Sequence, residues 1–339
     1  MHGTINLDRS EPLLDGRNLD ALVQRWLDDR ADALGAATVI GYGSKIAHFR
    51  RWWAYYGPRQ DWQMTRADLL RFREHLESYA LPGTKPMSYN QQKDILRRLR
   101  QVFNFADDQK YTPDRNYANW VPSARGSAPM HQAATIDAIA KLIDAARNQD
   151  YAPEDRGIVA RDLALIGLLL GTGMRRAECA ALDIADIQID ADGSGVAVVR
   201  KAKRVKGRDV QMRGVVFDAH TGAYLLAWLD SHKRTSGPLF VSFSDNGRGS
   251  RLSPQGVYKA INTHVLTAGV KDQIKRPCHD LRVAFATYWE RNRKGQAYNH
   301  LLSKQLGHSD YRMTAAYSRM DVEDVRQDFI SPLALIDGK

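Results

Sequence analysis

Four side chains able to bind, protonate and attack a phosphate lie near the C-terminal end of the chain. His279 and Arg282 are three positions apart, so they share one face if the segment opens a helix. His308 and Tyr317 follow within the same stretch. A tyrosine hydroxyl, whose ordinary pKa is about 10, is a weak nucleophile until cations or a base activate it. Arg282 and the two histidines supply such groups, so the stretch predicts phosphoryl transfer.

The residues around His308 predict how that side chain is presented. Leu306 and Gly307 precede it, and glycine at a helix C-terminus allows the left-handed turn that directs the next side chain away from the helix end. Tyr317 follows nine residues later, in a segment with the pattern of another short helix. Tyr311 is a rival nucleophile, but it lies only three residues after His308.

Metal binding is the alternative for this stretch, because His279, Asp280 and His308 are all residue types that bind metals. Arg282 would repel a cation, and no cysteine or second carboxylate completes the set of ligands. We therefore expect no metal and no other cofactor.

Two further segments carry groups suited to an anion. Gly171-Thr172-Gly173 leads into Met174-Arg175-Arg176-Ala177-Glu178, which places an arginine at a helix N-terminus. The Gly-Lys-Ser or Gly-Lys-Thr ending of a nucleotide-binding loop is absent. Residues 196–199 and 210–217 read as the strands of a β-hairpin. Its basic connection is either solvated or a source of a mobile proton-donating lysine, and it contains Arg200, Lys201, Lys203, Arg204, Lys206 and Arg208.

The overall charge favours an anionic partner. The chain of 339 residues has a formal net charge of +10, which fits a nucleic acid. Residues 1–14 carry acids and no apolar core, so they are not a secretory signal, and no apolar run is long enough to span a bilayer. The two cysteines, Cys179 and Cys278, form no disulfide framework and suit a reducing compartment. We expect a cytoplasmic protein in which both thiols serve as packing residues.

The N-terminal part, residues 17–121, predicts a compact helical DNA-binding domain. Four amphipathic segments carry apolar residues at helical spacing, the third beginning after Thr65 and the fourth after Ser88. Basic residues repeat on the second and fourth of these helices beside aromatic residues. Such a face is either solvated or in contact with DNA phosphates and grooves, and we favour DNA. The predicted DNA-binding residues there are Lys45, Arg50, Arg51, Lys93, Arg97, Arg98 and Arg100.

Residues 122–133 lack periodicity and read as a linker, which places a second domain at residues 134–339. Further helices are expected from Thr135, through 161–170, from Ser253-Pro254, and from Cys278 to Arg291. Residues 329–336 form an apolar tail. We expect this tail to dock on a neighbouring protomer, with docking on the chain's own core as the alternative.

These motifs, in this order, resemble those of the tyrosine recombinase, or phage integrase, family. The resemblance covers the whole chain and rests on the Gly-x-Arg-x-x-Glu turn, the hairpin lysine, the HxxR pair, Leu-Gly-His and the following tyrosine. The catalytic residues that it implies are Arg175, Lys203, His279, Arg282, His308 and Tyr317. The spacing to Glu178 favours Arg175 over Arg176. The spacing to Arg208 favours Lys203 over Lys201 and Lys206, and the resemblance adds Lys201, Arg204 and Lys206 as DNA-binding residues.

The resemblance implies a mainly α fold with a small sheet, arranged as a two-domain DNA clamp. A helical core-binding, SAM-like domain would precede an α+β catalytic domain. Its implied function is site-specific recombination through a 3′-phosphotyrosyl intermediate and a Holliday junction, without ATP or metal. Its implied partners are duplex DNA with an inverted-repeat site, a homotetramer joined through the C-terminal tail, and accessory proteins. A type IB topoisomerase and a non-catalytic DNA-binding regulator are the alternatives.

Overall fold

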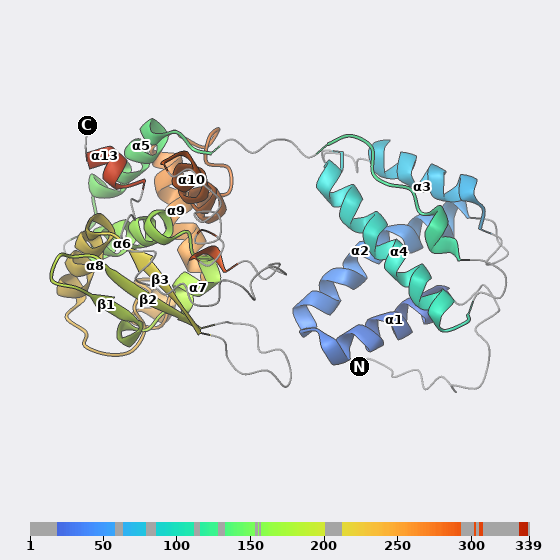
Figure 1. The fold of residues 1–339 in the computed structure, drawn as a ribbon, viewed down its shortest axis with the longest axis horizontal. Coiled ribbons are helices and arrows are strands. Elements are labelled where there is room, and N and C mark those ends of the chain that lie inside the picture. Colours follow the sequence, from blue (N-terminus) through green and yellow to red (C-terminus); the bar gives the residue numbers. More distant parts are fainter. Residues whose placement is uncertain are drawn as a thin grey trace. The chain divides into compact units, whose positions relative to one another are not determined.

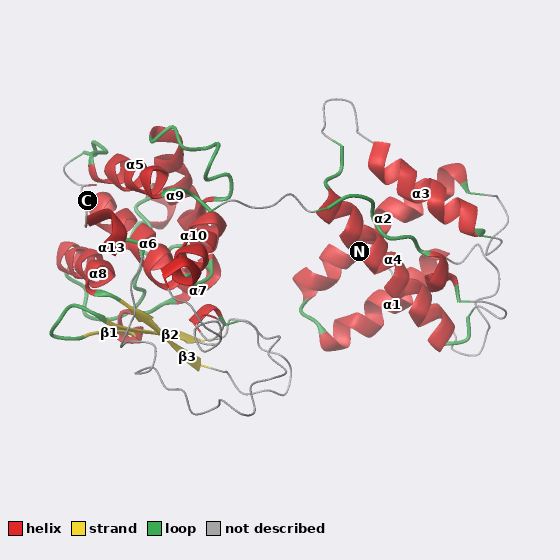
Figure 2. Ribbon diagram, turned by 45° about the horizontal axis from the view of Figure 1, so that its top comes forward, coloured by secondary structure: helices red, strands yellow, loops and turns green. Residues whose placement is uncertain are grey.

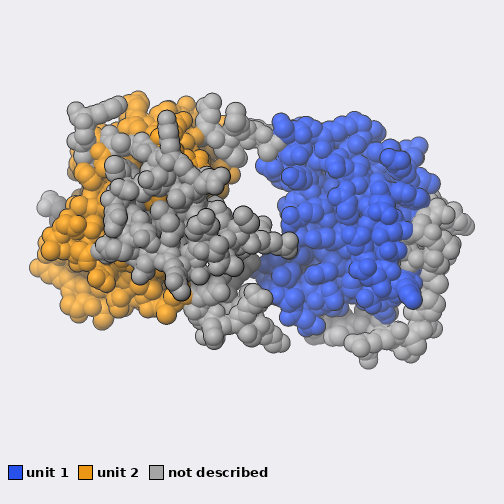
Figure 3. Space-filling model, in the orientation of Figure 1, with its two compact units in different colours: residues 1–130, 205–207 blue, residues 131–204, 208–339 orange. Residues whose placement is uncertain are grey.

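The chain folds into two compact units. The computed structural model describes residues 19–57, 64–78, 86–111, 116–127, 133–152, 155, 157–200, 212–292, 302, 305–307 and 332–337. One unit comprises residues 1–130 with 205–207, and the other comprises 131–204 with 208–339 (Figure 3). Each unit has its own hydrophobic core.

The regular structure in the described part of the first unit is all helical, joined by loops (Figures 1 and 2). Its helices are α1 (Leu19–Ala33), α2 (Ala36–Tyr56), α3 (Arg66–Ser78) and α4 (Tyr89–Asp108), followed by the 3-10 helix η2 (Tyr117–Trp120). Phe49 lies at the centre of its aromatic core, with ring centroids 4.9 Å from Phe72 and 6.0 Å from Phe103. The predicted starts of the third and fourth helices are confirmed, because Thr65 and Ser88 both accept hydrogen bonds from the first turns of α3 and α4.

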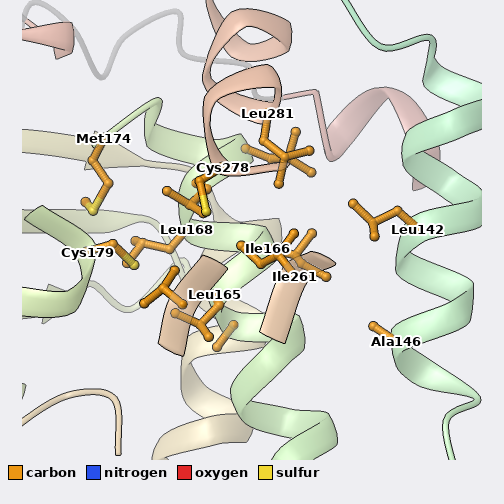
Figure 4. Packing of buried hydrophobic residues seen from close by; sticks show 14 of the residues in the cluster. Leu142, Ala146, Leu165, Ile166, Leu168, Met174, Cys179, Ile261, Cys278 and Leu281 are labelled. Atoms are coloured by element: carbon orange, nitrogen blue, oxygen red, sulfur yellow. The ribbon is translucent and has the colours of Figure 1, made fainter. Parts of the chain in front are cut away.

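The second unit surrounds one apolar helix, α6 (Gly157–Thr172), which contacts α5, α8, α9, α10 and strand β3. The other helices in the described part of this unit are α5 (Ile136–Arg147), α7 (Arg176–Ala181), α8 (Ala219–His232), α9 (Pro254–Thr267), α10 (Pro277–Asn292) and α13 (Ala334–Asp337), with 3-10 helices η4 (Ile184–Asp186) and η5 (Asp245–Gly247). Leu165, Ile166 and Leu168 of α6 meet Ile261 of α9 and Leu281 of α10 in the core (Figure 4).

A small antiparallel sheet lies in this unit (Figure 2). Its strand order is β1-β2-β3, formed by β1 (Ile187–Ile189), β2 (Gly195–Arg200) and β3 (Met212–Phe217). The register pairs Ala197 with Val215, and both side chains are buried. The predicted hairpin is therefore confirmed, and so is the mainly α fold with a small sheet. The sequence did not predict β1, whose three residues are too few for a strand pattern.

The described part of the C-terminal tail lies against the second unit of the same chain. Residues 332–337 end in α13, which contacts α5 of the same chain. Leu333 is 2% exposed and belongs to the unit's own core, and Ile336 packs against that core. Leu333 and Ile336 thus pack on the chain's own second unit, which is the alternative considered for this tail, and docking of the tail on a neighbouring protomer stays a prediction.

Candidate active site

Arg175 lies where α6 ends and α7 begins. Gly173 closes α6 in the left-handed region at φ +63°, and a Cβ there would lie 2.3 Å from Phe285 of α10. Glycine is thus required both by the backbone and by the packing. The Arg175 backbone N–H donates to Oε2 of Glu178 at 2.7 Å, and its Nη1 donates to Oε1 at 3.1 Å. Glu178 therefore caps the helix and holds the arginine at its start.

Arg282 approaches the same place from α10. Its Nη1 donates to the carbonyl of Gly173, and its Nη2 donates to the carbonyl of Leu306 at 2.9 Å. Arg175 also donates to Leu306, at 3.4 Å, and to the carbonyl of Gly307, at 3.3 Å. Two guanidinium groups from separate helices thus converge on one turn.

That turn is anchored to the edge of the sheet. Gln305 is 2% exposed, and its side-chain amide pairs with the backbone of Val216, accepting at 3.2 Å and donating at 2.7 Å. The amide satisfies backbone groups on the open edge of β3 in place of another strand. Leu302 and Leu306 join an apolar cluster with Phe285 beneath the turn. The position of residues 306–307 is therefore fixed by both packing and hydrogen bonds.

A third arginine, Arg213 of β3, completes what we call the arginine cluster: Arg175, Arg213 and Arg282 around Glu178. Nη1 and Nη2 of Arg213 donate to the two carboxylate oxygens of Glu178, each at 3.0 Å. Motif reasoning missed Arg213. The signal that would have found it is alternation, because Arg213 shares a face of β3 with the buried Val215 and Phe217. A charge on an inward-facing strand position needs a buried partner.

Burial and charge shift two pKa values in the cluster. Burial lowers the pKa of Arg282 to about 10, with further lowering from the positive charges of Arg175 and Arg213. Arg282 still stays cationic at neutral pH. Burial alone would raise the pKa of Glu178, but hydrogen bonds and charge from Arg213 and Arg175 outweigh it and bring the pKa below its ordinary value. The cluster therefore presents three cations and one carboxylate.

The structure places the remaining predicted catalytic residues as follows. Arg175, rather than Arg176, joins the cluster, since the guanidinium of Arg176 lies 5.8 Å from the ring centroid of Tyr258. His279 is exposed on α10, one turn before Arg282. Lys203, His308 and Tyr317 lie outside the described residues, as do the predicted DNA-binding residues Lys201, Arg204 and Lys206.

Asp280 and the cysteines have structural partners. Asp280, considered above as a metal ligand, accepts the backbone N–H of Arg276 at 2.8 Å and also bonds its guanidinium, which caps the start of α10. Burial raises the pKa of Cys278 to about 11 and the pKa of Cys179 well above its ordinary value. Both thiols face the core near Leu168 (Figure 4) and therefore stay protonated and unreactive.

The basic residues of α2 and α4 differ in how far they reach the surface. Arg51, Lys93 and Arg97 are exposed. Arg98 is 8% exposed, and its guanidinium lies 3.8 Å from the ring centroid of Tyr42. Arg98 is therefore an internal packing residue in this unit, contrary to its expected place on the DNA-facing surface. The others are part-buried and paired internally: Lys45 with Asp94, Arg50 with Asp20, and Arg100 with the carbonyl of Val121.

A mainly helical chain that brings two guanidinium groups onto the turn before a histidine has the features of an enzyme that acts on phosphodiesters. The model of the phage integrase family matches residues 134–324, more than half of the chain. The chain belongs to the phage integrase family.

Similar proteins span nearly the full length. The chain is 26% identical over 318 residues to the tyrosine recombinase XerC 2 of Ralstonia nicotianae, covering 90% of this chain and 84% of that one. It is 27% identical over 320 residues to XerD of Corynebacterium glutamicum, covering 90% and 95%.

Solved recombinase structures share the fold. XerH bound to a palindromic difH substrate has a TM-score of 0.63 at 19% identity, covering 91% of this chain and 82% of that one. A λ integrase tetramer bound to a Holliday junction has a TM-score of 0.61 at 18% identity, covering 87% and 78%.

These findings confirm the predicted family and function. The protein is a site-specific DNA recombinase, an enzyme that breaks and rejoins DNA, and DNA is its partner. The topoisomerase and regulator alternatives are not favoured. No helix in the described part of the chain is both long enough and apolar enough to cross a membrane.

Proposed function

We propose that Tyr317 attacks one scissile phosphodiester of a specific DNA site. The new bond joins the tyrosine oxygen to the 3′-phosphate, and the bond to the 5′-oxygen breaks to leave a 5′-hydroxyl. A 5′-hydroxyl from a second duplex then displaces the tyrosine, which exchanges strands through a Holliday junction. The phosphotyrosyl bond keeps the energy of the broken bond, so no ATP is needed.

One observation carries this proposal: Arg175 and Arg282 converge on the turn that immediately precedes His308. Phosphoryl transfer places charge on the non-bridging oxygens, and fixed guanidinium groups stabilise that charge best when they need no reorganisation. The Arg175 side chain is 48% exposed, so a phosphate can reach it from solvent. In this scheme the phosphate oxygens accept hydrogen bonds from the guanidinium N–H groups of Arg175 and Arg282. Without DNA, these N–H groups donate to the carbonyls of Leu306 and Gly307.

The other predicted residues take the proton-transfer roles. His279 and His308 orient the phosphate and accept the proton of Tyr317. Lys203 protonates the leaving 5′-oxygen from the basic hairpin connection. The order of these residues in the chain and the position of His279 beside Arg282 support the assignment.

A nicked suicide duplex tests the reaction. Fragments of DNA flanking the gene supply candidate sites, and the expected product is a covalent protein–DNA adduct. Lys203→Ala should slow adduct formation by about 10²–10⁴-fold, the range for a lost general acid. A 5′-thiol leaving group, which needs no proton, should restore much of that rate. If the 5′-thiol restored cleavage by Lys201→Ala or Lys206→Ala but not by Lys203→Ala, the general acid would be the lysine whose variant was restored.

The proposed DNA site is an inverted repeat, bound by residues 17–121 as a core-binding domain and residues 134–339 as a catalytic domain. Arg51, Lys93 and Arg97 are exposed on the first of these and suit phosphate contacts. Pairing of two sites requires four copies, and a tetramer on a Holliday junction is the form in which a λ integrase of the same fold was solved. Since the substrate is DNA, we place the enzyme in the cytoplasm, with accessory proteins as further partners.

Docking of the tail within one chain has a separate test. Leu333 is buried, so Leu333→Ala should lower the free energy of unfolding by about 2–5 kcal/mol. Thermal unfolding of the unbound protein measures this loss, with Leu226→Ala on the exposed side of α8 as the control. If Leu333→Ala left the melting temperature unchanged but abolished assembly on paired sites, we would conclude that the tail docks on a neighbouring protomer.

A further inference from the structure

Arg213 lies inside the arginine cluster, although it belongs to none of the motifs that predict the catalytic residues. Its fork bonds both oxygens of Glu178 at 3.0 Å. The side chains of Arg213 and Glu178 are 21% and 8% exposed, so the pair lies largely out of solvent. Bidentate arginine–carboxylate pairs of this kind fix the geometry of both partners.

Glu178 also accepts hydrogen bonds from Arg175, so the two arginines compete for the same carboxylate. A carboxylate has about four lone-pair sites. The fork of Arg213 fills two, and the backbone N–H and one side-chain N–H of Arg175 use the others. Without Arg213, both oxygens of Glu178 would be open to the matching fork of Arg175. Arg175 would then be drawn onto the carboxylate and away from a phosphate.

Arg213 also borders the turn that presents His308. A Cβ on Gly307 would lie 2.8 Å from Cζ and 2.9 Å from Nε of Arg213, and Gly307 has φ +63°. The turn therefore packs directly on the guanidinium. Nε of Arg213 is buried and has no acceptor among the described residues.

We propose that Arg213 is a positioning residue for DNA strand cleavage. Its fork saturates Glu178, which keeps Arg175 directed at the scissile phosphate, and its guanidinium supports the Gly307 turn that leads into His308. This role rests on the proposed function. It requires no contact between Arg213 and the DNA.

The charges around Glu178 give this role a distinctive pH dependence. Arg175 faces the carboxylate from the start of α7, Arg213 from β3 and Arg282 from α10. Burial raises the pKa of the neighbouring Cys179, which stays neutral. Burial also acts to raise the pKa of Glu178, and the hydrogen bond from Arg213 is the largest effect opposing it. Removing Arg213 therefore lets Glu178 take up a proton at higher pH than in the native protein.

The test is single-turnover cleavage by the full chain of a nicked duplex made from the flanking DNA. At saturating DNA, Arg213→Ala should cleave about 10- to 100-fold more slowly, the cost of a misplaced catalytic group, with little change in Kd. Arg213→Lys should recover only part of the rate, because lysine has no fork. Arg147→Ala is the matched control, since it removes an exposed arginine paired with Asp144 in the same unit.

The pH profile separates positioning from a general loss of structure. The ratio of native to Arg213→Ala rates should shrink as the pH is lowered, because a Glu178 that has taken up a proton no longer draws Arg175 away from the phosphate, and adding Glu178→Gln should abolish that change. Equal native and Arg213→Ala rates, or a loss that is the same at every pH, would overturn the role. Should Arg213→Ala unfold, Arg213→Lys carries the same pH test with the charge retained. Absence of any adduct with the native chain would instead contradict the proposed function itself.

Discussion

The arginine cluster of the second unit and the basic face of the first unit hold their charges in opposite ways. In the cluster, Glu178 is buried, and its two oxygens accept hydrogen bonds from Arg213 and Arg175 at 2.7–3.1 Å. On the first unit, Lys45 and Asp94 are 3.8 Å apart and about one-third exposed. Arg97 lies exposed on α4.

This difference separates residues that affect the rate of the chemical step from residues that affect the affinity for DNA. A buried, bidentate network holds its cations in place before DNA arrives, so their effect appears in the rate of the reaction. Exposed ion pairs contribute only about 0–1 kcal/mol to folding and are screened by salt. Exposed cations act instead through release of counterions from DNA, so their effect appears in the binding constant and its salt dependence.

The largest expected effect within this comparison of the two charged regions is that of Arg282→Ala. Loss of one fixed donor to a transition-state oxyanion slows catalysis by about 10²–10³-fold. We expect this loss in single-turnover cleavage at saturating DNA, whereas Arg97→Ala at saturation should cleave at nearly the native rate. If Arg282→Ala weakened DNA binding but left the saturated rate intact, the cluster would be a binding surface and the comparison would fail.

Neighbouring arginines on α4 sharpen the comparison within one helix. Arg98→Ala removes a buried guanidinium stacked on Tyr42 and should lower the stability of the first unit by about 1–3 kcal/mol. Arg97→Ala should leave stability within about 0.5 kcal/mol and reduce the slope of log Kd against log salt by about 1. Thermal unfolding and salt titrations of DNA binding measure both. If both substitutions reduced the salt slope equally, we would conclude that Arg98 contacts DNA as Arg97 does.

The smallest expected effect is a difference in acid sensitivity. Burial, followed by the charges of Arg51 and Lys45, lowers the pKa of His48, and burial lowers that of His75. Because these folded pKa values lie below the unfolded value of about 6.5, stability is lost as the pH falls below that value. Because the folded pKa of Glu178 is lowered, this carboxylate stabilises the fold at pH values above its unfolded pKa of about 4.3. That stabilisation is lost only as the pH falls below this value.

Among the described residues, burial also lowers the pKa of one histidine of the second unit, His232, so the first unit, with two such histidines, should lose more stability between about pH 7 and about pH 5.5. His48→Gln should reduce the fall in melting temperature between about pH 7 and about pH 5.5. A fall that is unchanged in His48→Gln but flattened by Glu178→Gln would reverse the order of the two units.

Local signals explain why most of the fold could be predicted. Ser88, Thr135 and Ser253 cap helices through hydrogen bonds to residues three positions later, so each helix start can be predicted from neighbouring residues alone. The hairpin strands follow the same logic. β1 escaped prediction because a strand of three residues has too little pattern, and its place depends on pairing with β2.

Contacts distant in sequence explain what could not be predicted. Arg213 and Glu178 are 35 positions apart, and only the folded chain brings them together. The same holds for Arg98, since the ring that buries it belongs to another helix. An apolar tail likewise has no sequence signal for which surface it covers, and the structure assigns Leu333 to its own core.

The most direct test of the account is to locate the covalent bond to DNA. After incubation with a nicked duplex that carries the site, the adduct is digested and the DNA-linked peptide is identified by mass spectrometry. We predict that the link is on Tyr317, that Tyr317→Phe binds DNA but forms no adduct, and that Tyr311→Phe still forms it. A link on Tyr311, or an adduct that persists in Tyr317→Phe, would contradict the assignment.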